Sequence, residues 1–198
     1  MTRTFARFAT GCALLAALAG VVFTVSFAIV VEEGERWAQW VAWSALFTGG
    51  LASIPVMTAL NAMLGEDEPQ FVIVAFVLGI SGALGAAIHG AFDLALLANP
   101  LDVEPSGLNA VDPRGVLTFG TFGLGLGLFG WLMLRTGRLP RLVARLALGE
   151  SALLLLLYLS RVTVLDPETN VIRVAALLSG LVVLPAFYVM LGRAWSPE

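Results

Sequence analysis

Four ionisable side chains whose types allow proton transfer or ion binding lie inside long apolar stretches: His89, Asp93, Glu150 and Arg161. His89 and Asp93 are four residues apart and therefore stack on one helix face. At about 1.5 Å per residue, His89 and Asp93 lie about 7 and 13 Å beyond the midpoint of their helix, on the side that is predicted below to face outward. Arg161 lies about 11 Å beyond the midpoint of its own helix on the same side. This shared depth predicts an Asp93–Arg161 ion pair with His89 alongside.

Two interpretations of this cluster are open. In the functional one it is the polar floor of an outward-facing ligand pocket, and His89 changes its protonation near neutral pH. In the structural one it is an ion pair near the membrane interface, with Arg161 extending outward to water. Glu150 lies only ~5 Å from its helix midpoint. We expect its carboxyl to be protonated or hydrogen-bonded to a neighbouring helix, in either a binding or a structural role.

The composition argues against an enzyme, a metal site or a bound cofactor. The single histidine cannot build a multi-histidine zinc site or a bis-histidine haem site within the chain. The single cysteine, Cys12, excludes an intrachain disulfide. Residues 125–130 match the G-x-G-x-x-G of dinucleotide sites, but they lie inside an apolar helix and follow no strand. We therefore expect no catalytic residues, metal or cofactor.

Glycines recur every three or four residues in two apolar stretches, so each set shares a helix face. Such faces let helix backbones approach closely in lipid. We expect helix packing from Gly120, Gly123, Gly127 and Gly130 in one stretch, and from Gly79, Gly82, Ala86 and Gly90 in the other.

Length and composition define the fold class. Hydrophobic residues form 59% of the 198 residues and charged residues 13%, and a bilayer span needs roughly 20 apolar residues. The sequence predicts an all-α polytopic transmembrane bundle, a single membrane domain over residues 1–198. Its first span is predicted to be an uncleaved helix rather than a signal peptide. About six spans are expected, at 8–31, 37–64, 71–98, 116–134, 142–165 and 171–191.

The distribution of arginines predicts the orientation of these spans. All eleven basic residues are arginines, and the net charge of −3 gives no reason to expect a nucleic-acid partner. If both termini are cytoplasmic, seven arginines lie inside and four outside, as the positive-inside rule requires. Four of the seven lie in the short segment 135–145. We therefore expect both termini in the cytoplasm, with the lipid bilayer as the main partner.

The segment 130–141, GWLMLRTGRLPR, resembles the junction of the fourth and fifth helices in a bacterial family of six-helix membrane proteins of unknown function (the domain-of-unknown-function 4386 type). That family leads a glycine-rich helix into an R-S/T-G-x-L-P-R turn. The resemblance implies the six-span fold and a bacterial inner-membrane location, and no catalytic residues. In such a turn Gly137 can end one helix in a left-handed cap, and Pro140 suits the start of the next.

A second likeness is to the small substrate-capturing subunits of vitamin importers, whose first helix docks on a partner through an A-x-x-x-A face. Ala9, Ala13 and Ala17 have that spacing here. Together these features predict a non-enzymatic membrane protein that binds, transports or senses a small ligand. The alternatives are a structural subunit of a larger membrane complex, a homo-oligomer among them, and a vitamin-type capturing subunit.

Overall fold

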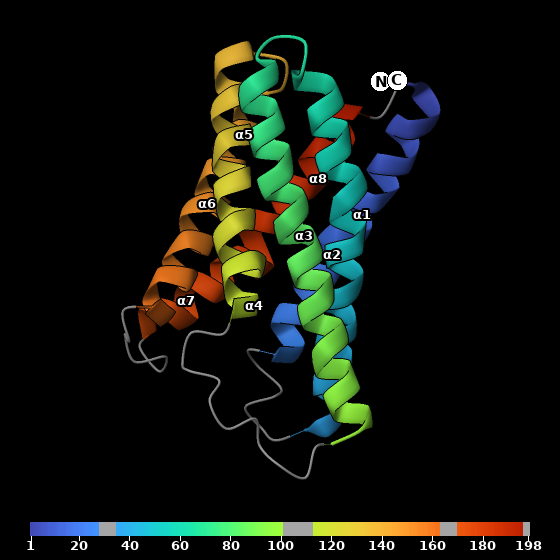
Figure 1. Ribbon diagram of the computed structural model, residues 1–198, viewed down its shortest axis with the longest axis vertical. Helices are drawn as coiled ribbons and strands as arrows, with labels where there is room; N and C mark the ends of the chain where they lie inside the picture. The colour runs from blue at the N-terminus through green and yellow to red at the C-terminus, as the bar shows by residue number, and fades with distance from the viewer. Residues whose placement is uncertain (28–34, 101–112, 163–169, 196–198) are drawn as a thin grey trace.

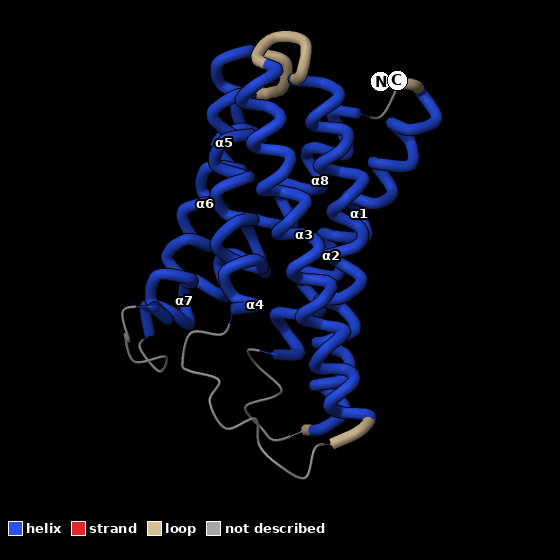
Figure 2. Tube along the Cα trace, in the orientation of Figure 1, coloured by secondary structure: helices blue, strands red, loops and turns tan. Residues whose placement is uncertain are grey.

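The computed structural model describes residues 1–27, 35–100, 113–162 and 170–195, and these are helical apart from short turns (Figure 2). Within these residues, six helical spans are long and apolar enough to cross a membrane, which confirms the predicted all-α bundle. The ends of the first and fifth predicted spans, 28–31 and 163–165, lie outside the described residues. The helices are α1 (Arg3–Val25), α2 (Arg36–Leu64), α3 (Pro69–Ala98), α4 (Pro113–Gly115), α5 (Phe122–Thr136), α6 (Arg141–Val162), α7 (Asn170–Leu178) and α8 (Leu184–Trp195).

Among the described residues, the fourth and sixth spans contain complete π-helical turns. The fourth span joins η3 (Val116–Thr121) to α5, and the sixth joins α7 to α8 through η4 (Ser179–Val183). Pro185, the second residue of α8, has no N–H to donate to the preceding turn, which favours a local departure from α-helical bonding at η4. Turns of this kind are frequent at functional sites.

The spans form a closed ring in chain order. Each span packs on the next one in the sequence, and α8 packs back on α1. The start of α1 and the end of α8 lie at one end of the bundle, and α4 and the start of α7 lie at the opposite end (Figure 1). We call these the terminal end and the loop end.

The two halves of the ring differ in how they are filled. Large side chains such as Met57, Leu60, Phe129, Leu132 and Leu191 are fully buried and pack as the hydrophobic core. In the first three spans, the inner faces nearer the loop end carry mostly alanine and glycine, which leave space between the helices. The half of the bundle near the terminal end is therefore close-packed, and the half near the loop end contains a cavity.

Several helix pairs approach so closely that a side chain would not fit between them. A β-carbon added at Gly125 would lie 2.6 Å from the backbone nitrogen of Gly79, and one at Gly50 would lie 2.5 Å from that of Ala87. Four glycines of the fourth span face side chains or backbone of α6: Gly120, Gly123, Gly127 and Gly130.

Charged turns connect the spans at the terminal end. Arg138 donates hydrogen bonds to Asp67 and Glu66 in the turn between α2 and α3, and Arg135 lies 2.7 Å from Glu68. The hydrogen bond to Asp67, followed by the charges of Asp67 and Glu66, raises the pKa of Arg138. Gly137 adopts a φ of +65°, the left-handed cap expected from the sequence.

Candidate functional site

A cavity of about 770 Å³ lies inside the ring, and every one of the six spans contributes to its wall. Its volume falls within the range of roughly 300–1,000 Å³ that is usual for small-molecule sites. Most of the wall is apolar, with phenylalanine rings and small residues. The polar residues of the wall are Thr24, Ser53, Thr118, Arg173, Ser179 and Tyr188.

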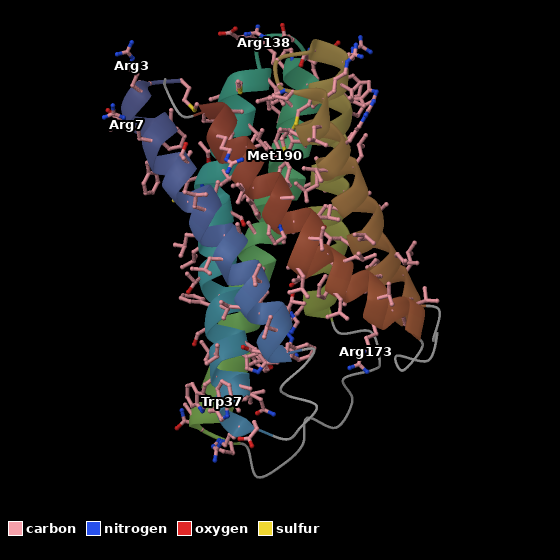
Figure 3. The ribbon with its side chains drawn as sticks, turned by 180° about the vertical axis from the view of Figure 1, so that it is seen from behind. Arg3, Arg7, Trp37, Arg138, Arg173 and Met190 are labelled. Atoms are coloured by element: carbon pink, nitrogen blue, oxygen red, sulfur yellow. The ribbon has the colours of Figure 1, made fainter. Side chains whose placement is uncertain are left out.

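The cavity exists because small side chains and π-helical turns coincide around it. Its wall includes Ala16, Ala19 and Gly20 from α1, and Gly82, Ala83 and Ala86 from α3. Both π-helical turns also contribute, with Thr118 and Phe119 from η3, and Ser179 and Gly180 from η4. Arg173 lies toward the loop end, the opposite end from Arg3 and Arg138 (Figure 3).

Ser53 and Tyr188 form one polar pair of the wall. The Ser53 hydroxyl donates to the backbone carbonyl of Gly49 at 2.8 Å, and Ser53 Oγ and Tyr188 Oη are 2.6 Å apart. A serine hydroxyl has one hydrogen. Tyr188 is therefore the donor in the second bond, which links α2 to α8.

Glu150 lies on α6, one hydrogen bond behind the wall. Its side chain is fully buried, and its Oε1 accepts a 2.6 Å hydrogen bond from the hydroxyl of the wall residue Ser179. This is the bond to a neighbouring helix that the sequence led us to expect. Its Oε2 is buried and has no hydrogen-bond partner in the described part of the chain.

His89 lies on α3 and is also one contact behind the wall. Its Nδ1 is 3.4 Å from Oγ1 of the wall residue Thr118, and its ring stacks on Trp43 of α2 with centroids 5.6 Å apart. His89 Nε2 lies 3.3 Å from Asp93 Oδ2. This pair is close, but it lacks the alignment of a hydrogen bond, because Asp93 Oδ2 makes none within the described chain.

Asp93 is paired with Arg114, an arginine that the depth argument did not select. Arg114 of α4 donates a 3.1 Å hydrogen bond to Asp93 Oδ1 and places its guanidinium 4.5 Å from the centre of the Phe92 ring. The side chain of Arg161, the predicted partner, lies outside the described residues. Arg114 follows a long connection, so its distance in sequence from α3 concealed its proximity in space.

Three of the four predicted site residues can be placed, and Arg161 cannot, because its side chain lies outside the described residues. His89 and Asp93 lie together as expected, and Glu150 is held separately by Ser179. The cavity wall itself is built from other residues, with Thr118 between it and His89, and Ser179 between it and Glu150.

Sequence reasoning missed the hydroxyl-bearing residues of the wall. Ser53, Ser179 and Tyr188 are polar residues within otherwise apolar spans, a signal present in the sequence. Hydroxyl groups can bond their own helix backbone, so this signal does not separate wall residues from ordinary ones.

No metal-binding cluster is found among residues 1–27, 35–100, 113–162 and 170–195: nowhere do three or more histidine, cysteine or acidic side chains come together in a way that could hold an ion. Comparisons with family models, curated proteins and solved structures gave no match to the chain.

Proposed function

We propose that this chain binds a small, largely apolar molecule in its central cavity and acts as a binding, transport or sensing protein rather than as an enzyme. The observation that carries the proposal is the cavity of about 770 Å³ with a wall from all six spans. Protein interiors are close-packed, and a large apolar void forfeits contacts that its lining would otherwise make. A ligand restores those contacts.

We further propose that the protein resides in a bacterial inner membrane, with both termini in the cytoplasm and the loop end outside. The six apolar spans are compatible with an integral membrane protein. The arginine distribution and the resemblance of the turn at residues 130–141 support the finer assignment. In this orientation the cavity lies in the outer half of the bundle.

We also infer that glycine-rich faces hold this bundle together internally. The four glycines of the fourth span face α6, and Gly82 and Gly90 of α3 face Phe122 and Phe47 of neighbouring helices. Faces occupied within the chain are not available to another subunit, so this packing favours ligand binding over a scaffold role. Likewise Ala9, Ala13 and Ala17 are buried in the bundle, and α1 packs on α8, which favours the ligand-binding proposal over the vitamin-importer alternative.

Filling the cavity tests the proposed function. Ala176 lines the cavity, and Val174 on the same helix is 52% exposed on the outer surface. We expect small molecules extracted from the purified wild-type protein, identified by mass spectrometry, to include one that is retained by Val174→Phe and lost from Ala176→Phe. If the two variants and the wild type carry identical extracts, the cavity is not a ligand site.

A further inference from the structure

Three hydroxyl groups of the cavity wall have their hydrogens committed to acceptors within the chain, which bears on the class of ligand. The hydrogen of Ser53 is donated to the Gly49 carbonyl, that of Tyr188 to Ser53, and that of Ser179 to Glu150. Each hydroxyl has only one hydrogen to give. Ser179 and Tyr188 can therefore offer the cavity only oxygen lone pairs, which accept hydrogen bonds and cannot donate them.

Behind the Ser179 hydroxyl, Glu150 has a carboxyl oxygen that accepts no hydrogen bond in the described chain. The side chain is fully buried, and its Oε2 has no partner in the described chain. A buried carboxylate is costly unless it is paired with a positive group or a hydrogen-bond donor. Ser179 is both the wall residue and the bonded neighbour of Glu150, so a donor in the cavity at Ser179 approaches this carboxyl.

We propose, resting on the function proposed above, that the cavity binds a lipophilic ammonium: a basic amine on an apolar body, its N–H groups at the Ser179 hydroxyl oxygen and its charge facing Glu150. The hydroxyl of Ser179 is polarised by its bond to Glu150, which strengthens its oxygen as an acceptor. A carboxylate or phosphate head group would find only an acceptor in the Ser179 hydroxyl.

The rest of the wall suits an apolar body. Phe23, Phe122, Leu154 and Leu157 present rings and aliphatic groups to the cavity. Arg173, the positive residue of the wall, precedes Ser179 by six residues, about 9 Å by helical rise, and lies toward the loop end. The proposed ammonium position is thus at a distance from this like charge.

A thin part of the wall faces the lipid. Ala19 and Ala45 line the cavity and also a shallower groove of about 400 Å³ on the outer surface between α1 and α2. The exposed side chains of this groove include Leu18, Trp40 and Val41. A molecule dissolved in the bilayer would meet the protein here, which agrees with a lipophilic ligand.

The test compares three probes that differ only in their head group: 4-phenylbutylamine, 4-phenylbutan-1-ol and 4-phenylbutyrate. Binding to the full chain in detergent at neutral pH is followed by the shift of the unfolding temperature, read from tryptophan fluorescence. We expect the amine to bind about tenfold or more tightly than the alcohol and the carboxylate, as for hydrogen bonds to a charged group.

Two variants and one control test whether the preference for the amine over the alcohol depends on Glu150 and Ser179. Glu150→Gln keeps a carbonyl oxygen for Ser179 and removes the charge, so it should abolish the preference of the amine over the alcohol. Ser179→Ala should reduce that preference. Glu66 is an exposed carboxylate at the terminal end, and Glu66→Gln should keep the full preference. The ratio of amine to alcohol affinity is measured within each variant, so a difference in stability between variants does not affect it.

The outcomes separate this inference from the proposed function. Equal binding of amine and alcohol, tighter binding of the carboxylate, an unchanged preference in Glu150→Gln, or no binding of the amine would each overturn the ammonium inference. If the alcohol binds as well as the amine and Ala176→Phe prevents both, the cavity remains a ligand site. If all binding persists in Ala176→Phe, the proposed function itself is overturned.

Discussion

At the scale of single residues, the ion pair of Asp93 illustrates what helical spacing can and cannot predict. The stacking of His89 and Asp93 follows from their four-residue spacing, and the structure places them 3.3 Å apart. Helical depth says how far a residue lies along the bundle, but not which helices are neighbours. It selected Arg161, whose side chain lies outside the described residues, and it did not point to Arg114, which contacts Asp93. The contact between α4 and α3 is a property of the assembled bundle, which the depth of a residue along its own helix does not indicate.

The partner of Asp93 can be identified by a double-mutant cycle. We expect Asp93→Ala and Arg114→Leu to be coupled by about 1 kcal/mol of unfolding free energy, because the pair is partly exposed and partly screened. Asp93→Ala combined with Arg161→Leu should show additive losses. Thermal and chemical unfolding in detergent supply the measurement. Coupling to Arg161 instead of Arg114 would restore the pairing expected from depth alone.

The hydrogen bond between Ser179 and Glu150 gives a second prediction at this scale. Ser179→Ala leaves both carboxyl oxygens of Glu150 buried without a donor, and we expect a loss of about 1–3 kcal/mol of unfolding free energy. Adding Glu150→Leu to Ser179→Ala removes the unsatisfied group and should recover much of that loss in the same unfolding assay. A double variant less stable than Ser179→Ala alone would show that Glu150 stabilises the fold through other contacts.

At the scale of helices, the six spans were predictable and their irregular turns were not. Apolar length and the charged residues that bound it are local properties, so each span could be recognised from its own sequence. The ends were less certain: α1 begins at Arg3, because Thr2 caps it by accepting the N–H of Phe5, and not at the first apolar residue, Phe8. The π-helical turns η3 and η4 were not predicted, although Pro185 is a local feature of the sequence that favours η4.

In the half of the bundle that contains the cavity, the glycine positions were likewise predictable and the cavity was not. The glycine positions on α3 and the fourth span were apparent from spacing, but spacing does not distinguish a glycine that meets a backbone from one that faces space. Gly50 was not among the expected packing residues, yet it makes one of the closest helix approaches. The cavity arises from the combined small residues of several spans, a property of the assembled ring.

Close helix approach is testable at Gly50. A β-carbon there would lie 2.5 Å from the nitrogen of Ala87 and 2.6 Å from the carbonyl oxygen of Ala83, and neither backbone atom can move aside alone. We expect Gly50→Ala to lower the unfolding free energy by about 1–3 kcal/mol. Gly11→Ala is the matched control, since nothing lies within 4 Å of its added carbon, and better helix propensity should raise stability by up to about 1 kcal/mol. Equal effects at the two sites would contradict a packing role for Gly50.

At the scale of the whole molecule, the ring explains how six spans of a short chain can enclose a cavity. Six spans in chain order bring α8 back to α1, and the turns at the terminal end are tied together by Arg135 and Arg138. The core fills the half near these ties, and the cavity occupies the half near the loop end. A protein built in this way can hold one end rigid while a ligand enters the other half.

The direction in which the cavity faces follows from the side on which the termini lie. Thr2 and Arg138 are at the terminal end, and Glu35 is exposed at the loop end, next to the first residue of α2. In a Cys12→Ser background, single cysteines from Thr2→Cys, Arg138→Cys and Glu35→Cys can be tested in spheroplasts with a maleimide that does not cross membranes. Because the arginine-rich segment 135–145 resists translocation, we expect Glu35→Cys to react before lysis and the other two only after it. Labelling of Thr2→Cys or Arg138→Cys in intact spheroplasts would invert the bundle and open the cavity half toward the cytoplasm.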